Sequence, residues 1–181
     1  MQNQKNNKGF LKGQAAMEYL MTYGLALFII IIVLALIASY LPKLIQTPEN
    51  CMFTQPGLTC SKQIIYYDAV NKIDMVTFKF ENQQGQAIDL KGIVCTTMPA
   101  TSINKTFVID KGGLTSRLSA GQVIDTTVPC YEADGKPTEL GKGSPFKGSI
   151  AVVYTGAEDP EGAPSRVAIA TLTGTVIEGE G

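Results

Sequence analysis

The sequence predicts an α+β protein, in which a long hydrophobic N-terminal helix precedes a disulfide-braced antiparallel β-domain, sandwich-like or a curled sheet. Three observations support this prediction. No charged residue lies between Tyr19 and Pro42, the chain from Asn50 onward is rich in Gly, Pro, Thr and Val, and all four cysteines lie in that second part. We therefore expect three segments: a basic leader over 1–13, a transmembrane or filament-core helix over 14–46, and an exported β-rich head over 47–181.

The uncharged run has the length of a membrane-spanning helix. Its centre, Leu25–Ala38, is almost purely aliphatic, and a bilayer core requires about 20 such residues at about 1.5 Å each. Because the run is apolar on all sides, lipid or other helices must surround it. Residues 1–13 contain three lysines and no acid, which predicts a cytoplasmic N-terminus and an exported remainder.

A cleaved secretory signal and a plain signal-anchor are the alternatives for this segment. The apolar run exceeds the usual signal core of about 7–15 residues, and no A-x-A-type cleavage site follows it. Glu18 begins the run, at a depth where an uncompensated carboxylate costs about 3 kcal/mol. A simple anchor gains nothing from that charge. After a cut before Gln14, however, Glu18 would lie one helical turn from a new α-amino group, and the same amine on a neighbouring chain could neutralise it.

The run KGQAAMEYLMTYG that begins at Lys12, followed by aliphatic residues, resembles the class III signal peptide of archaeal type IV pilins. In that family a prepilin peptidase cuts on the cytoplasmic side of the helix, so that a Gln becomes the first mature residue and a Glu the fifth. The resemblance implies a cut between Gly13 and Gln14, with Lys12 in the recognition flank and Glu18 as the family's acid in assembly. It covers about residues 8–41.

The resemblance also implies a function and partners. The chain would be a structural subunit of a surface filament, held in the membrane as a precursor until an assembly ATPase and a membrane platform protein extract it. Its helices would then pack in the core of a homo-oligomeric helical filament outside the cell, for use in adhesion. Two alternatives remain: a membrane-anchored or minor tip protein that binds surfaces through its β-domain, and a plain signal-anchored surface domain.

The chain from Asn50 onward has the composition of short strands and turns. From Asp74 to Glu81, Val76 and its alternate neighbours are apolar and the residues between them are polar, which indicates a strand with one buried face. Short strands at regular spacing favour a single antiparallel β-domain. The predicted strands lie near 62–69, 73–82, 86–95, 105–110, 121–128, 147–155 and 166–177.

The four cysteines allow three disulfide connectivities. An even number on the exported side favours disulfides. Cys51 and Cys60 flank a Pro-Gly turn, whereas Cys95 and Cys130 each end a predicted strand, so we favour the pairs 51–60 and 95–130. The alternative is a four-cysteine zinc site, but the sequence contains no C-x₂-C pair.

Composition argues against several classes of function. The 15 Lys and Arg balance 16 Asp and Glu, which is unlike a nucleic-acid-binding protein. The absence of His excludes Ser-His-Asp and Cys-His nucleophiles and the common His-containing metal sites. No carboxylate pair lies in a recognisable catalytic motif. We therefore expect no enzyme activity, no cofactor, no metal and no nucleic-acid partner.

Three further features are candidate surface sites. Asn104-Lys105-Thr106 is the only N-x-S/T sequon and is either a glycosylation site or a chance match. Residues 158–162 gather three carboxylates, but they lack the calcium-loop pattern, so we interpret them as a solvated turn that could form an exposed contact. Tyr66 and Tyr67 lie on opposite faces of a strand, so at most one could stack on a sugar, and core packing is the commoner role.

Overall fold

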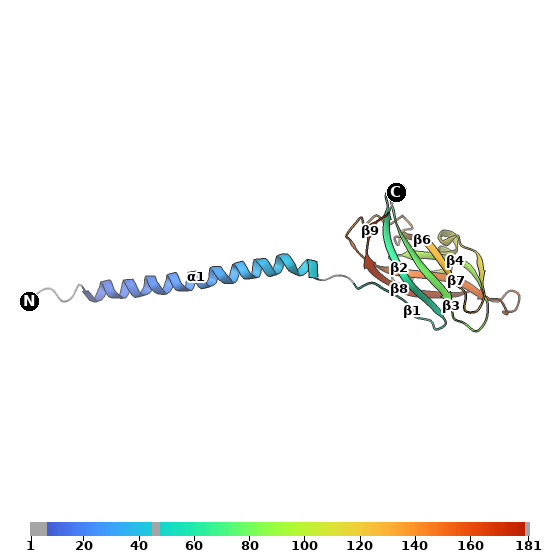
Figure 1. The fold of residues 1–181 in the computed structure, drawn as a ribbon, viewed down its shortest axis with the longest axis horizontal. Coiled ribbons are helices and arrows are strands. Elements are labelled where there is room, and N and C mark those ends of the chain that lie inside the picture. Colours follow the sequence, from blue (N-terminus) through green and yellow to red (C-terminus); the bar gives the residue numbers. More distant parts are fainter. Residues whose placement is uncertain (1–6, 45–47, 180–181) are drawn as a thin grey trace, which may run out of the picture. The chain divides into compact units, whose positions relative to one another are not determined.

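The computed structural model describes residues 7–44 and 48–179 of the chain. Side chains of residues 7–16, Glu18 and 41–44 lie outside that description. By its packing the chain divides into two units, Met1–Gln46 and Thr47–Gly181, which we call the helix unit and the head (Figure 1).

The helix unit contains α1, Asn7–Leu44. Its segment Tyr19–Tyr40 has a mean hydropathy of 2.9 and is long and apolar enough to cross a membrane. The described side chains of this segment are exposed on all sides. Two of its hydroxyls are bonded within the helix, because Thr22 donates to a carbonyl three residues earlier at 3.1 Å and Ser39 to one four residues earlier at 2.8 Å. Such bonds suit an apolar environment, where an unsatisfied polar group is costly.

The described part of the head forms one curled sheet with the strand order β1-β8-β7-β4-β6-β3-β2-β9, and β5 pairs with β4 off this path (Figure 1). The predicted α+β class is therefore observed. The element bounds are β1 Asn50–Phe53, β2 Leu58–Asp68, β3 Ile73–Asn82, β4 Ile88–Thr96, a 3₁₀ turn Ala100–Ser102, α2 Lys105–Gly112, β5 Ser116–Leu118, β6 Val123–Tyr131, β7 Pro145–Gly156, β8 Arg166–Thr175 and β9 Ile177–Glu178.

The sheet is mixed, which corrects the expectation of a purely antiparallel domain. Most neighbours are antiparallel, but β4 pairs with β6 in parallel and β2 pairs with β9 in parallel. Parallel strands require a crossover connection of a dozen or more residues, usually one that contains a helix. Residues 97–122 form that connection between β4 and β6, and they include α2.

The core lies inside the curl. Alternate residues of β3, among them Val76, Phe78 and Phe80, are essentially inaccessible to solvent, as their alternation predicts. The curl brings β1, at one edge of the sheet, next to β2, which lies near the other edge. The other large and fully buried side chains include Ile88, Leu90, Ile93, Leu118, Phe146, Ile150 and Leu172.

The strand predicted at 105–110 is instead the helix α2, and this prediction was wrong. Thr, Phe, Val and Ile in this segment favour a strand, but the ends of the segment favour a helix. The side chain of Asn104 accepts a hydrogen bond from the amide of Phe107 at 2.8 Å, and Gly113 ends the helix in the left-handed conformation at φ 47°. These are the usual N-cap and C-terminal signals of a helix.

Two glycines allow α2 to lie directly on the sheet. A Cβ on Gly92 of β4 would lie 2.6 Å from the carbonyl oxygen of Val108, and one on Gly112 would lie 2.6 Å from the backbone of Ile93. Val108 itself is fully buried in a second apolar cluster on the outer face of β4 and β7. Tertiary packing therefore overrides the local strand preference of this segment.

Candidate functional site

The predicted processing and assembly residues lie on α1. Gly13 and Gln14 fall within the helix, and Glu18 follows Gln14 by four residues, which is about 6 Å along the helix axis. Their side chains lie outside the described residues. The cut and the role of Glu18 therefore stay predictions.

The Cys51–Cys60 disulfide links β1 to β2, with 5.7 Å between the two Cα atoms. It is one of the two bonds of the favoured pairing. Neither cysteine is fully buried. In the described head β1 and β2 share no hydrogen-bonded ladder, so the disulfide adds a second covalent link to the short backbone connection 54–57 between them.

The Cys95–Cys130 disulfide lies in the centre of the head. Both residues are fully buried, and they are directly paired in the parallel register of β4 and β6. All four cysteines are therefore disulfide-bonded, so none is free to bind zinc, and the four-cysteine zinc site is excluded. Within residues 7–44 and 48–179, no group of three or more His, Cys, Asp or Glu side chains gathers to hold a metal ion.

Asn104 is exposed at the start of α2, and its side-chain oxygen caps the helix. The sequon therefore lies at a helix N-terminus, at the start of the segment that was predicted as a strand. Lys105 donates from Nζ to the backbone oxygen of Ser165, which connects this helix start to the β7–β8 loop. The cap uses the amide oxygen, whereas a glycan would be attached to the amide nitrogen, so the two roles are compatible.

The acidic loop 158–162 separates into one structural carboxylate and two solvated ones. Asp159 accepts from the amide of Gly156 at 2.6 Å and pairs with the Arg166 guanidinium at 2.8 Å. Glu158 and Glu161 are exposed. The arrangement fits a solvated turn held by Asp159, with two negative charges at its surface.

The two adjacent tyrosines of β2 face opposite sides, as expected. Tyr67 packs against the core. Tyr66 is paired with Met75 of β3 and Ile177 of β9, and the backbone of Gly179 lies against its ring. Tyr66 is therefore only partly accessible, in a row of apolar neighbours.

Asp74 is a buried acid that the sequence analysis did not single out. It is fully buried at the start of β3; its Oδ2 accepts from the amide of Leu140 at 2.9 Å, and its Oδ1 has no partner among the described residues. Burial raises the pKa of the Asp74 carboxyl, while the hydrogen bond from the amide of Leu140 opposes that increase. The signal was present in the sequence, because Asp74 shares the inward face of the strand with Val76.

Asn82 is a second buried polar residue that was missed. Its amide nitrogen donates to the carbonyls of Gln86, Leu118 and Ser119 at 2.9–3.2 Å, and its oxygen accepts from the amide of Gln84 at 3.0 Å. One side chain thereby joins the β3–β4 turn to β5. The alternation of β3 places Asn82 on the inward face with Val76, but it does not predict these partners, which come from two segments, 84–86 and 118–119.

Together these features define a class of protein in which the described residues contain one apolar helix that can anchor the chain or direct its export, and a head whose disulfides indicate an oxidising environment. Compared with known proteins, the chain matches no family model and no curated protein. Its function is therefore inferred from its own residues.

Proposed function

We propose that the chain is a structural subunit of an archaeal type IV pilus-like surface filament, cut before Gln14 by a prepilin peptidase and assembled through α1. The observation that carries the proposal is a helix with exposed apolar side chains over Tyr19–Tyr40, directly after the Gly13–Gln14 motif with its Glu18. Such a helix must be covered by lipid or by other helices. A filament core of identical helices offers the same apolar surroundings as the membrane, so transfer between them costs little.

The head supports the proposal in two ways. It has its own core inside the curled sheet, and we propose that the two halves of the sheet act as a sandwich-like shell around it. Its two disulfides persist in oxidising surroundings and constrain the unfolded chain. A head of this kind would coat the filament and supply its adhesive contacts, while the ATPase and the membrane platform act on the helix.

The test is the N-terminal peptide of protein sheared from the cell surface, identified by mass spectrometry. We expect a start at Gln14, either free or cyclised with loss of ammonia, in a fraction that contains filaments by electron microscopy. A mature start excludes the plain signal-anchor. An intact Met1 end confined to membranes would overturn the proposal.

A membrane-anchored surface-binding protein is the second candidate, since one span of 22 residues is sufficient as an anchor. Abundance separates it from the first candidate. A structural subunit should be the main protein of the sheared fraction, whereas an anchored or tip protein should be scarce there. An enzyme would instead show hydrolytic activity, which we do not expect.

A further inference from the structure

The β2–β3 turn presents an exposed apolar side chain on a rigid support. Val70 at its tip is 80% exposed, more than any other large apolar residue in the described head. Asp68 holds the turn, because its carboxylate accepts from the amides of Val70 and Asn71 at 2.9 and 3.2 Å and from the Asn71 side chain at 2.7 Å. These hydrogen bonds, chiefly the one from the Asn71 side chain, lower the pKa of the Asp68 carboxyl, so the carboxylate that accepts them is ionised at neutral pH.

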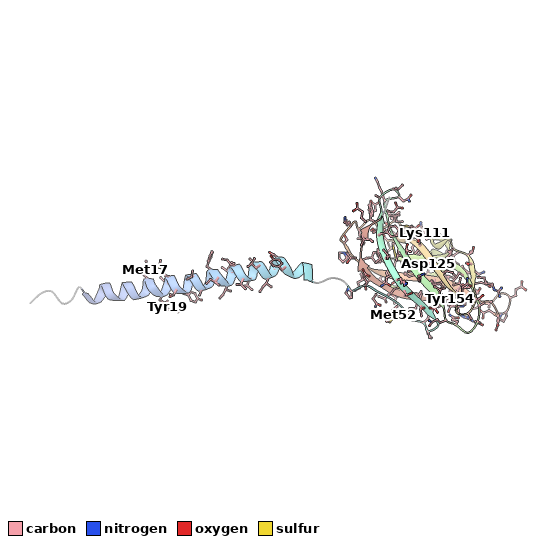
Figure 2. All side chains as sticks on the ribbon, in the orientation of Figure 1. Met17, Tyr19, Met52, Lys111, Asp125 and Tyr154 are labelled. Carbon is pink, nitrogen blue, oxygen red and sulfur yellow. A yellow bond between two sulfur atoms is a disulfide. The ribbon has the colours of Figure 1, made fainter. Side chains whose placement is uncertain are left out.

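The opposite end of β2 contains a hollow that could receive such a side chain. Residues Cys51–Cys60 line this open surface hollow, and its volume is about 420 Å³. Met52 lies in this lining and is 63% exposed, second only to Val70 in the described head. Figure 2 labels Met52 on β1, beside this turn.

The turn and the hollow lie at the two ends of one strand. The hollow surrounds the β1–β2 turn, where β2 begins, and Val70 follows Asp68, where β2 ends, so about 30 Å separates them at about 3.3 Å per residue. In Figure 1 these turns are at opposite ends of the head, and the end of β2 that leads into the β2–β3 turn pairs with β9. Because they are different surfaces that face away from each other, contact between copies would be heterologous, and such contacts form open filaments when the rotation does not close a ring.

We propose that the β2–β3 turn of one subunit inserts Val70 into the Cys51–Cys60 hollow of the next copy of this chain, so that the heads join head to tail. This contact rests on the proposed filament function, since it would act between subunits already aligned by their helices. It covers the two most exposed apolar side chains of the described head at once, and burying apolar surface favours association.

Charge also favours this pairing. Lys72 is exposed two residues after Val70. Glu81 accepts a hydrogen bond at 3.2 Å from Thr59, which lines the hollow. A docked turn would bring the ammonium of one copy toward the carboxylate of the next, which would set the orientation of the contact.

The oxidation rate of Met52 tests the contact in the native protein. Sheared filaments and detergent-extracted subunits are treated with dilute hydrogen peroxide, and Met52 sulfoxide is followed by mass spectrometry. We expect oxidation to be at least about tenfold slower in filaments, because methionine oxidation depends on exposure of the sulfur. Val70→Asp should abolish this protection and reduce filament yield.

Ile109→Asp is the matched control, because Ile109 is 45% exposed on α2 and lies on neither surface. We expect it to leave Met52 protection and filament yield unchanged, and both variants should unfold at the wild-type temperature. Filaments in which Met52 oxidises as fast as in free subunits would overturn the contact and leave the filament function intact. A sheared fraction without filaments of this chain would overturn both.

Discussion

In α1 the apolar side chains of Tyr19–Tyr40 are exposed, whereas in the head Phe78, Phe146 and their neighbours are fully buried. The head therefore contains the contacts that stabilise it. The helix depends on lipid or on other helices for the same purpose. Changes in α1 should therefore alter processing and assembly without altering head stability. Changes in the head core should alter head stability without altering processing and assembly.

Gly13→Val should have the largest effect, namely loss of the mature protein. A branched side chain would crowd the peptidase subsite at the proposed cut, so the precursor should accumulate at full length while the head keeps its unfolding temperature. Intact mass and immunoblot measure the outcome, and Gly9→Val is the control in the same leader. Mature-length Gly13→Val protein would place the cut elsewhere.

Glu18→Ala should leave cleavage largely intact but strongly reduce filament yield. In the filament the carboxylate would lose its pairing with the α-amine of a neighbouring chain, and each 1.4 kcal/mol lost weakens the contact about tenfold. Quantitative electron microscopy of sheared fractions measures this yield, with Glu18→Asp as the control that retains the charge. Normal piliation of Glu18→Ala cells would exclude the assembly role.

The two disulfides should differ in their contribution to head stability. In the chain-entropy model, the sequence separation of 35 residues between Cys95 and Cys130 corresponds to about 3.8 kcal/mol, and the separation of 9 between Cys51 and Cys60 to about 2.6 kcal/mol. Denaturant unfolding of the two double Cys→Ser variants measures these losses. Removal of the buried pair should cost more, since it also leaves buried hydroxyls. An equal or reversed order would contradict this.

Asn82→Ala should destabilise the head by about 2–3 kcal/mol, because it leaves three backbone carbonyls without their shared donor. Processing and filament export should persist if enough folded protein remains. Thermal and denaturant unfolding measure the effect. Gln83→Ala, at the exposed neighbouring position, is the control and should be close to wild type. A loss below about 0.5 kcal/mol for Asn82→Ala would show that water replaces the network.

Asp74→Asn should have the smallest effect, and that effect should depend on pH. Because burial raises the native pKa of Asp74 above its ordinary value of 3.8, the folded state holds the proton more tightly than the unfolded state. Head stability should therefore fall as the pH rises from about 3.8 through the raised native value. Asp74→Asn removes this pH-dependent loss of stability, because asparagine does not titrate. The unfolding free energy of the variant should therefore rise relative to that of wild type as the pH increases.

Unfolding free energies measured from pH 3 to pH 8 test this prediction, with Asp110→Asn on the exposed surface of α2 as the baseline. If wild type and Asp74→Asn show parallel pH dependence, the buried carboxyl does not carry the pH dependence assigned to it. Filament processing should be unaffected in both variants.

Particular elements show where sequence reasoning succeeded. β3 was predicted at 73–82 and observed at Ile73–Asn82, because strict alternation marks a strand that is buried on one face. The favoured disulfide pairs are the observed ones. In contrast, α2 was predicted as a strand, and β1, β5 and β9 were missed because strands of two to four residues carry no measurable periodicity.

The sequence by itself determined the apolar helix, its position relative to the Gly13–Gln14 motif, and the β-rich character of the head. These properties depend on local composition and on periodicity over neighbouring residues. Only the tertiary structure decided the parallel pairing of β4 with β6, the helix α2, the hydrogen bond from Leu140 to Asp74 and the position of the Cys51–Cys60 hollow at the other end of β2 from Val70. Each of these depends on contacts between residues distant in sequence, and local preferences do not encode which segments meet.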